Sequence, residues 1–598
     1  MKKQLCILIL LCIGYFVNAQ EVPRSEYPRP QFVRNAWINL NGAWTYTFDF
    51  GNSGKNRRLN ESKGFDGKII VPYCPESKLS GVEHKDFINN MWYQRTISVP
   101  ADWNGKKIIL HFGAVYYKAE AYIDGKFVGR HTGGTSSFEF DITSFVTAGK
   151  DHNLVIYVND ELRSGKQTGG KQCTNYFSEG CSYTRTTGIW QTVWMEAASN
   201  FGLKSTQVIT DLDQKQVVIH PIFFNENNNL SLKVTLKDNG KIVAQKIVKA
   251  NNSSVCILPV ANVKTWSPEN PFLYDLVYEV VDKDNKTIDV VNSYVGIRKI
   301  HIEGNRVFLN NQPYYQRLVL DQGFYPDGIW TAPTDNDLKK DIEMSIAAGF
   351  NGARLHQKVF EERFHYWADK LGYLTWSESS SWDSDYNDIE AHRNFISEWS
   401  EIILRDRNYP SIVTWTPYNE TWGPDQEQYP RFVQDLYKTT KGLDPTRPIN
   451  DASGGTHVIT DLWTVHNYEG DSTKLAEILT PKADGKMFSN DNYKFAPYAG
   501  QPYLIDEFGG IRWIPTAKDK NSESSWGYGD APKTLEEYYS RLEGEVDAIL
   551  SRPNVWGYCF TQLTDVEQEQ NGIYLYNRSL KFDMKRIKAI FNKVPSFK

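Results

Sequence analysis

Two glutamates in the second half of the chain, Glu420 and Glu507, have the residue type and setting of a catalytic pair. Glu420 follows the apolar segment 412–415, and Glu507 follows the apolar segment 503–505. If both segments are strands of one parallel barrel, both carboxylates lie at the same end, nearly opposite each other. Two facing carboxyl groups can serve as general acid/base and nucleophile on a glycosidic bond. A lone glutamate after a strand is more often a solvated or salt-bridged loop residue, so the hypothesis depends on the pair.

Polar side chains also follow the other apolar segments of this half of the chain. A polyol substrate needs converging hydrogen-bond donors and acceptors, and a ring to stack on. Taken singly, each such residue has a structural interpretation, and His356 could only orient a neighbour. Together they predict a carbohydrate pocket lined by Asn419, Asp321, Arg354, His356, His466, Tyr468, Trp513 and Gln562. Further candidate stacking platforms are Trp415, Trp422 and Trp526.

The segments that must position these residues alternate between short apolar runs and helical patterns from about residue 305 onward. Eight apolar segments occur, near residues 315, 353, 374, 413, 449, 463, 504 and 557. An open doubly wound sheet is one arrangement for this alternation. Eight units over about 290 residues favour a C-terminal (β/α)8 TIM barrel over residues 301–598.

The first half of the chain has the pattern of β-structure. Residues 119–123 alternate, and Asp124-Gly125 then forms a turn before the alternation resumes, which is typical of a hairpin. Strands at this spacing predict a β-sandwich of the jelly-roll kind over residues 20–199. A second β-rich block predicts an immunoglobulin-like sandwich over residues 200–300. The total length of 598 residues is in the range of several domains.

Residues 1–19 have the pattern of a signal peptide. Lys2 and Lys3 precede an apolar run, and small residues precede a cleavage site near Ala19. The run of about 13 apolar residues is too short for a stable membrane span. We therefore expect an exported protein, periplasmic or secreted, without a membrane span. Five of the seven cysteines remain after cleavage, an odd number, and Cys173 and Cys181 could pair or stay free.

Charge and motif content exclude several other classes of function. The formal net charge is −5, which argues against a nucleic-acid binder because such proteins usually carry a basic excess. The sequence has no Gly-x-Ser-x-Gly elbow, His-Glu-x-x-His motif, phosphate loop or dinucleotide fingerprint. Aromatic residues make up 14% of the chain, and sugar-binding clefts and sandwich cores both use them heavily. We expect a carbohydrate partner and no cofactor.

Several short motifs are spread over nearly the whole mature chain, at residues 40–44, 91–95, 187–194, 296–298, 309–313 and 349–354. With Asn419-Glu420 and the segment around Glu507, they resemble glycoside hydrolase family 2, as found in enzymes that Bacteroidetes export. The resemblance implies that residues 20–199 are a sugar-binding domain and that Glu420 is the acid/base. It also implies that Glu507 is the nucleophile, that Asn419 contacts the sugar 2-hydroxyl and that Tyr468 lies near the nucleophile. The implied mechanism retains configuration through a glycosyl-enzyme intermediate.

Departures from subgroups of that family favour a neutral sugar. Its β-glucuronidases bind the substrate carboxylate with an Asn-x-Lys motif, and Glu569 and Asn571 stand in those places here. Its magnesium-dependent β-galactosidases have Glu-x-His after the third strand, whereas serines follow Glu378, so no metal site is expected. The resemblance thus implies an exo-β-glycosidase for terminal β-galactosides. The alternatives are a β-glucuronidase, a β-mannosidase or a non-catalytic carbohydrate-binding protein, and sandwich domains of this kind can pair into a homo-oligomer.

Overall fold

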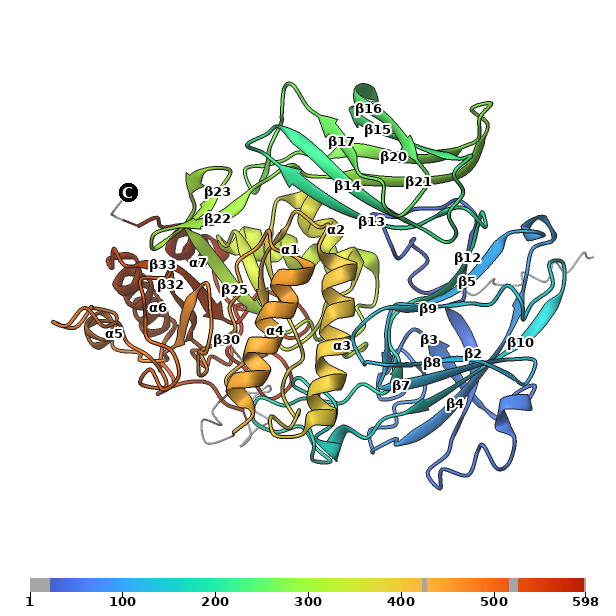
Figure 1. Ribbon diagram of the computed structural model, residues 1–598. Helices are drawn as coiled ribbons and strands as arrows, with labels where there is room; N and C mark the ends of the chain where they lie inside the picture. Colours follow the sequence, from blue (N-terminus) through green and yellow to red (C-terminus); the bar gives the residue numbers. More distant parts are fainter. Residues whose placement is uncertain (1–21, 422–426, 516–524, 596–598) are drawn as a thin grey trace, which may run out of the picture.

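The computed structural model describes residues 22–421, 427–515 and 525–595, which form three units in sequence order (Figure 1). A β-sandwich comes first, a smaller immunoglobulin-like sandwich follows, and a parallel barrel surrounded by helices completes the chain. The predicted fold class is confirmed. Residues 1–19, with the predicted cleavage site near Ala19, lie outside the described residues.

The first sandwich packs a four-stranded sheet (order β1-β12-β5-β9) on a six-stranded sheet (order β3-β2-β4-β10-β7-β8). β10 illustrates how an alternating sequence forms a strand of this sandwich, because side chains alternate between the two faces of a strand. Leu154, Ile156 and Val158 enter the core between the sheets, while Val155 and Tyr157 pack on the other face. The strands are β1 (Trp37–Asn39), β2 (Gly42–Phe48), β3 (Gly67–Val71), β4 (Asn90–Ser98), β5 (Lys107–Phe112), β6 (Val115–Tyr116), β7 (Lys118–Ile123), β8 (Lys126–Thr132), β9 (Phe138–Asp141), β10 (Asp151–Asn159), β11 (Gly188–Ile189) and β12 (Val193–Ala198).

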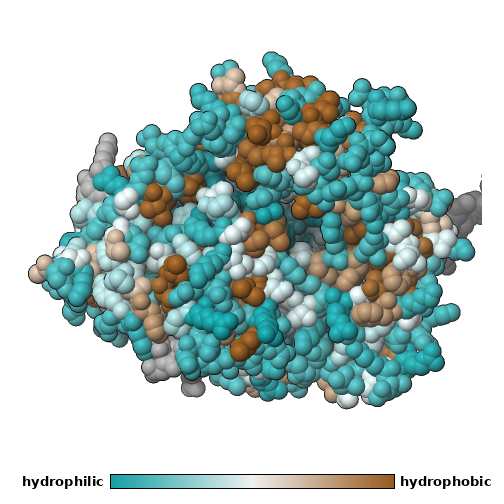
Figure 2. All heavy atoms as spheres, viewed as in Figure 1, coloured by the Kyte–Doolittle hydropathy of each residue, from teal (hydrophilic) through white to brown (hydrophobic). Residues whose placement is uncertain are grey.

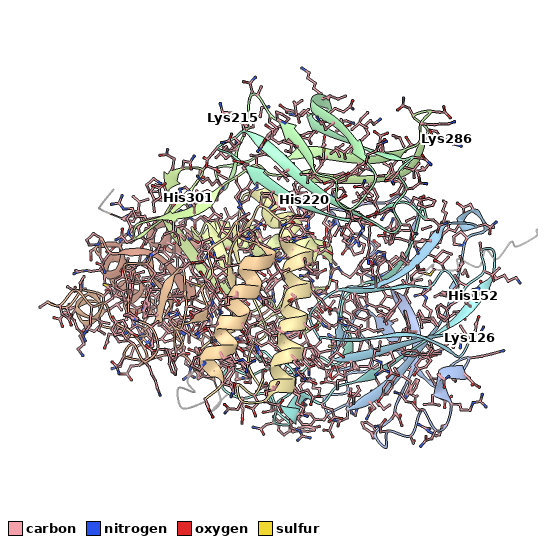
Figure 3. The ribbon with its side chains drawn as sticks, viewed as in Figure 1. Lys126, His152, Lys215, His220, Lys286 and His301 are labelled. Carbon is pink, nitrogen blue, oxygen red and sulfur yellow. The ribbon has the colours of Figure 1, made fainter. Side chains whose placement is uncertain are left out.

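The second sandwich has a three-stranded sheet (order β13-β14-β17) and a four-stranded sheet (order β16-β15-β20-β21). Figure 2 shows apolar side chains gathered on the face of this domain that is turned to the viewer. Ile242 and Ile247 of β16 are among its exposed apolar residues. Figure 3 shows Lys215 and Lys286 pointing away from the same domain. The strands are β13 (Leu203–Asp211), β14 (Gln216–Phe223), β15 (Ser231–Asp238), β16 (Lys241–Lys249), β17 (Cys256–Pro259), β18 (Trp266–Ser267), β19 (Asn270–Pro271), β20 (Tyr274–Val281) and β21 (Thr287–Val295).

Seven parallel strands of the barrel form one sheet in the order β28-β27-β26-β25-β33-β32-β31. The remaining strand position, between β28 and β31, is taken by residues 449–453. Trp415 bridges to Ile449 there, and β29 (Tyr418–Asn419) pairs with β30 (Ala452–Ser453). All eight predicted strands are therefore present. The seven are β25 (Gln316–Asp321), β26 (Gly352–Leu355), β27 (Leu374–Glu378), β28 (Ile412–Thr416), β31 (Trp463–His466), β32 (Tyr503–Gly509) and β33 (Val555–Thr561).

The interior of the barrel is a packed apolar core. Leu320, Leu374 and Leu504 meet there, and Ile300 and Leu309 close it from the end nearest the second sandwich. These last two residues belong to the junction strands β22 (Ile300–Glu303) and β23 (Arg306–Leu309), which pair with β24 (Gln312–Pro313). Because this end is filled, a ligand can reach the barrel only at the opposite end, where the strands finish.

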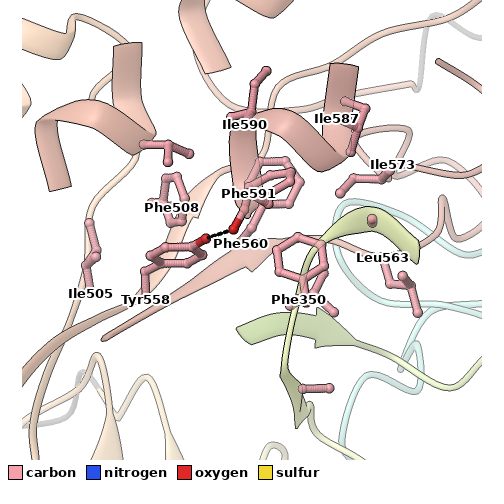
Figure 4. Packing of buried hydrophobic residues seen from close by; sticks show 14 of the residues in the cluster. Phe350, Ile505, Phe508, Tyr558, Phe560, Leu563, Ile573, Ile587, Ile590 and Phe591 are labelled. Carbon is pink, nitrogen blue, oxygen red and sulfur yellow. Dashed lines mark hydrogen bonds between the residues drawn. The ribbon is translucent and has the colours of Figure 1, made fainter. Parts of the chain in front are cut away.

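The helices outside the strands are α1 (Asp335–Ala348), α2 (Glu362–Leu371), α3 (Ile389–Asp406), α4 (Tyr429–Leu443), α5 (Ser472–Ile478), α6 (Leu535–Leu550) and α7 (Met584–Phe591). Thr334 begins α1 with a capping box to Asp337, as the sequence Thr-x-x-Asp allows. α7 locks the end of the chain against the barrel, since Phe591 packs on Phe350 and Phe560 (Figure 4). In the described ranges, we find no helix with the length and apolar character needed to cross a membrane.

One long loop of the first sandwich, residues 165–187, reaches the open end of the barrel; we call it the 165–187 loop. Gly169 N donates to Trp382 O (2.7 Å) and Gly170 N donates to Ser380 O (3.1 Å). Gly170 has φ +61°, and a Cβ there would lie 2.3 Å from Gln357 O, so only glycine permits this close approach. Cys173 and Cys181 lie in this loop and are both free.

Candidate active site

Glu420 and Glu507 face each other at the open end of the barrel. Glu507 lies within β32, and Glu420 directly follows β29, where its backbone N donates to Ser453 O (2.9 Å). Glu420 has φ 44°, a left-handed conformation that a side chain adopts at a cost and that turns the carboxylate out of the strand direction. One oxygen of each glutamate and one ring nitrogen of His466 all lie within 4.8 Å of one another.

Arg354 of β26 is the centre of the hydrogen-bond network under Glu507. Its side chain is fully buried, and Nη1 donates to Glu507 Oε1 (2.9 Å) while Nε donates to Glu378 Oε2 (2.6 Å). Nη2 also donates to Asn419 Oδ1. The Asn419 amide is thereby oriented, and its Nδ2 is buried without a partner among the described residues. A buried amide donor left over in this way is available to a ligand oxygen.

His466 lies between the two glutamates. Nδ1 is 2.7 Å from Glu420 Oε1 and 3.5 Å from Glu507 Oε2, while Nε2 is 3.5 Å from Asp506 Oδ1. Burial acts to lower the pKa of His466, but the charges of Glu507, Asp506 and Glu420 outweigh burial and raise it. These neighbours therefore favour the cationic form of His466, whose ring lies between Glu420 and Glu507.

The surroundings of Glu507 keep its carboxylate ionised. Burial acts to raise the pKa of Glu507, but the nearby cations His466 and Arg354 outweigh burial and hold that pKa well below its usual range. Tyr468 donates its hydroxyl to Glu507 Oε2 and stacks on Tyr528, with ring centroids 3.3 Å apart. An ionised carboxylate with a fixed orientation is what a nucleophile at this position requires.

His356 takes no part in these direct contacts. Its Nδ1 lies 3.0 Å from Arg354 Nη2 and from Glu378 Oε1, one step away from Glu507. Burial lowers the pKa of His356 well below its usual range, and the Lys171 and Arg354 charges act in the same direction. The ring is therefore neutral and helps to hold Arg354 and Glu378 in place.

A second group of buried polar residues stands beside the pair, at the end of β33. Glu569 is 1% exposed and accepts hydrogen bonds from Tyr183 OH and from Asn571 Nδ2 (3.1 Å). Gln562 Nε2 donates to Asn571 Oδ1 (2.7 Å), and Gln562 Oε1 is buried without a partner among the described residues. Tyr183 comes from the 165–187 loop, so two domains build this part of the site.

Asp321 and Trp513 were expected in the pocket, but within the described residues neither side chain is hydrogen-bonded to Glu420 or Glu507. Asp321 accepts a hydrogen bond from Gly323 N (2.9 Å), and burial together with the Asp341 charge raises its pKa to about 7. The Trp513 ring packs near Tyr538, with ring centroids 6.3 Å apart, while its backbone N donates to Gln570 O (3.2 Å), next to Glu569. Of the proposed platforms, Trp415 is buried in the core, Trp526 stands against Tyr528, and Trp422 lies outside the described residues.

Lys171, Tyr183 and Trp382 belong to the site but were missing from the sequence-based candidates. Trp382 Nε1 donates to Asn419 O (3.2 Å), and the Lys171 ammonium lies 5.2 Å from the centre of the Trp382 ring. One sequence signal could have found the first two residues. The stretch between two strands around residues 165–187 is far longer than an ordinary connection, and such loops are usually functional.

The chain matches three consecutive family descriptions. "Glycosyl hydrolases family 2, sugar binding domain" covers residues 38–195, "Glycosyl hydrolases family 2" covers 202–298, and "Glycosyl hydrolases family 2, TIM barrel domain" covers 332–509. The chain belongs to glycoside hydrolase family 2. It is therefore a glycoside hydrolase, with its candidate active site in the family's barrel domain.

Relatives of this family 2 hydrolase carry more than one specificity in their names. It is 25% identical to a β-glucuronidase of Paenibacillus borealis over 71% of this chain and 74% of that protein. It is 26% identical to a β-galactosidase of Thermoanaerobacter pseudethanolicus over 80% of this chain, which spans 63% of that longer protein. A β-glucuronidase structure from Ruminococcus gnavus shares the fold, with a TM-score of 0.77, 21% identity, and coverage of 96% of this chain and 100% of that one.

Proposed function

We propose that this glycoside hydrolase is a retaining exo-β-glycosidase that removes a terminal neutral hexose, with β-galactosides as the leading substrates. The spacing of Glu420 and Glu507 supports the retaining mechanism in this proposal. Retaining enzymes separate their two carboxyl groups by about 5–5.5 Å, whereas inverting enzymes need about 6.5–9.5 Å to admit a water molecule. The separation of less than 4.8 Å between one oxygen of each glutamate fits the first geometry.

In the first step, a Glu507 oxygen forms a bond to the anomeric carbon while the bond from that carbon to the leaving oxygen breaks. Glu420 gives its proton to the leaving oxygen. In the second step, water attacks the anomeric carbon, Glu420 takes the water's proton, and Glu507 leaves as a carboxylate. The donors Arg354 and Tyr468 favour the ionised Glu507, which assists its departure in this second step.

The same donors set the geometry of the reaction. Arg354 holds both Glu507 and Asn419, so the nucleophile and the amide expected at the sugar 2-hydroxyl keep a fixed relation. The unpartnered Asn419 Nδ2 has the right chemistry for a hydroxyl oxygen. A hydrogen bond that strengthens as positive charge develops on the ring lowers the barrier.

Glu569 supports a neutral sugar. It occupies one place of the Asn-x-Lys motif that β-glucuronidases of this family use for the substrate carboxylate, and it is buried at the site. Burial raises the pKa of Glu569, while the Lys171 charge and its hydrogen bonds act in the opposite direction. A carboxyl group here offers a good acceptor for sugar hydroxyls and repels a second carboxylate when it is ionised.

A β-glucuronide is the second candidate. Curated relatives such as those of Paenibacillus borealis and Bacteroides fragilis bear the name β-glucuronidase. The Lys171 ammonium near Glu569 could also receive a substrate carboxylate, although it would then stand against the Glu569 carboxyl group.

A panel of nitrophenyl β-glycosides tests the reaction and its specificity. We expect the purified protein to cleave the β-galactoside in preference to the β-glucuronide, β-mannoside and β-glucoside, and to release β-galactose first, as seen by NMR. Glu507→Gln should lower turnover by roughly 10³-fold or more with unchanged folding, because the nucleophile is lost. The exposed Glu427→Gln is the matched control. Undiminished turnover in Glu507→Gln would refute the assignment of the nucleophile, and preferential cleavage of the glucuronide would refute the neutral specificity.

A further inference from the structure

Lys171 is a largely buried lysine at the candidate active site. Its residue is 6% exposed, and in the described part of the chain no hydrogen bond or ion pair is made by its Nζ. The Trp382 ring, 5.2 Å away, provides a cation–π contact. In the described part of the chain, the Lys171 Nζ is not one of the fully buried polar atoms that lack a partner, so the ammonium remains accessible and can bind a ligand.

The backbone holds Lys171 firmly at this position. Lys171 O accepts from Tyr183 N (2.7 Å), and the preceding Gly169 and Gly170 are hydrogen-bonded to Trp382 O and Ser380 O. The 165–187 loop is thus tied to itself and to the barrel on both sides of the lysine. A side chain with a fixed base loses little further freedom when it binds a ligand.

The groups whose charges affect the pKa of Lys171 indicate which residues lie near its ammonium. Burial acts to lower the pKa of Lys171, but the nearby groups that can carry negative charge, first Cys181 and then Glu569 and Glu507, outweigh burial and raise it. Lys171 also contributes to the lowered pKa of Glu507 and of His356. Its ammonium is therefore charged and lies within electrostatic reach of both the nucleophile and the β33 end of the site.

Glu569 is the natural counterpart of Lys171. Tyr183 and Asn571 each donate one hydrogen bond to a different Glu569 oxygen, so each oxygen keeps a lone pair free. No ion pair joins Lys171 to Glu569 within the described residues, although both are buried. The Lys171 ammonium is a donor and the Glu569 carboxylate is an acceptor. Because they do not bind each other and a hydroxyl both donates and accepts, sugar hydroxyls can bind to both groups.

We propose that Lys171 and Glu569 form a hydroxyl-binding pair for the terminal sugar, and that Lys171 is a specificity-determining residue supplied by the first sandwich. This inference rests on the proposed exo-glycosidase function and names the part of the protein that recognises the sugar. Lys171 donates to one or two ring hydroxyls, and Glu569 accepts from a hydroxyl nearby. In the complex, each of the two charged groups thereby gains a sugar hydroxyl as a hydrogen-bond partner.

The test combines changes in the enzyme with changes in the substrate. Lys171→Met and Lys171→Arg are assayed on nitrophenyl β-galactoside and on its 3-deoxy, 4-deoxy and 6-deoxy analogues, with folding checked by circular dichroism. Lys166→Met is the matched control, because Lys166 is in the same loop but forms a surface ion pair with Glu390 (2.5 Å). We expect Lys171→Met to lower kcat/KM on the parent sugar roughly 10- to 100-fold, the usual loss for a charged hydrogen bond. The loss should nearly disappear on the analogue that lacks the hydroxyl bound by Lys171.

The outcomes separate this inference from the proposed function. An equal loss on the parent sugar and all three analogues would show that Lys171 acts only on the structure of the site, and would overturn the inference. Galactoside cleavage unaffected by Lys171→Met would also overturn it while leaving the function standing. If the wild type prefers the glucuronide and Lys171→Met loses that substrate selectively, Lys171 binds a carboxylate, and both the neutral specificity and the hydroxyl-binding pair fall.

Discussion

At the scale of single residues, one cation connects the two glutamates on which the proposed chemistry depends. His466 Nδ1 contacts Glu420 directly and lies 3.5 Å from Glu507, and its own pKa is raised by these neighbours. The imidazolium therefore compensates part of the negative charge of Glu507. Without it, the ionised state of Glu507 would be less favourable, because Arg354 would be the main cation left beside it.

His466→Asn should change the pH dependence of the reaction. The cationic ring helps to hold the pKa of Glu507 below its usual range, so its removal should raise that pKa. A larger fraction of Glu507 is then protonated as the pH falls, and the acidic limb of kcat/KM should move to higher pH. His220→Asn is the control, since His220 lies on the second sandwich (Figure 3). An acidic limb in the same position in His466→Asn and wild type would contradict this role.

The residues of the site differ in how far the sequence could predict them. Strand ends alone make Glu420 and Glu507 a candidate pair, because a parallel barrel brings all its C-terminal strand ends to one mouth, while their separate roles were inferred from the family resemblance. The same rule does not say which way a side chain turns, and Asp321 accepts its hydrogen bond from Gly323 N. Lys171 could not be predicted from strand ends, because it comes from another domain and its position depends on long-range contacts.

At the scale of structural elements, the 165–187 loop depends on a glycine at its closest approach to the barrel. A Cβ on Gly170 would lie 2.3 Å from Gln357 O and 3.1 Å from Ser380 Cβ. Gly170→Ala should displace the loop and lower kcat/KM roughly 10- to 100-fold, because small misplacements of binding groups are costly. Steady-state kinetics on the preferred glycoside measures the effect.

Gly180→Ala is the control that distinguishes the steric clash at Gly170 from the strain of a left-handed backbone conformation. Gly180 also has a positive φ (+54°), but a Cβ there would meet nothing within 4 Å. Its substitution therefore carries the left-handed strain without the contact, and its activity should stay close to wild type. Equal losses in the two variants would show that close approach to the barrel is not what Gly170 provides.

The strands of the barrel were predictable because they are short, apolar and separated by helical patterns. The position between β28 and β31 shows the limit of that pattern. Ile449 bridges to Trp415, but Asn450, Asp451 and Ser453 follow it with polar side chains that take part in hydrogen bonds around the site. Apolar periodicity thus predicts where this strand lies. It does not predict that the strand pairs only in short segments, at Ile449 and at β30.

At the scale of the whole molecule, buried ion pairs join units that are distant in sequence. Arg34 contacts Asp289 of the second sandwich (2.9 Å) and Glu196 of the first (3.5 Å). Arg24 contacts Glu361 beside the barrel helix α2 (2.6 Å). These residues are held in the interior, so their charges depend on each other.

Asp289→Ala should weaken the junction between the two sandwiches. Arg34 would lose its nearest carboxylate while staying buried, which typically costs about 3–5 kcal/mol of unfolding free energy. Differential scanning calorimetry should show an earlier transition, whereas Asp284→Ala, at an exposed turn position, should leave it in place. An unchanged first transition in Asp289→Ala would mean that this pair does not couple the domains.

Because the 165–187 loop of the first sandwich extends to the barrel, it also affects how the sugar specificity of the enzyme can evolve or be engineered. If the sugar pocket is assembled from two domains, a chimaera that joins this barrel to the sandwich of a relative keeps Glu420 and Glu507 but replaces Lys171 and Tyr183. Such a hybrid would retain the bond-breaking apparatus and change its choice of sugar. Recombination at the domain boundary would then be a route to new specificities without any substitution in the barrel, and libraries for redirecting this hydrolase should vary the loop before the strand ends.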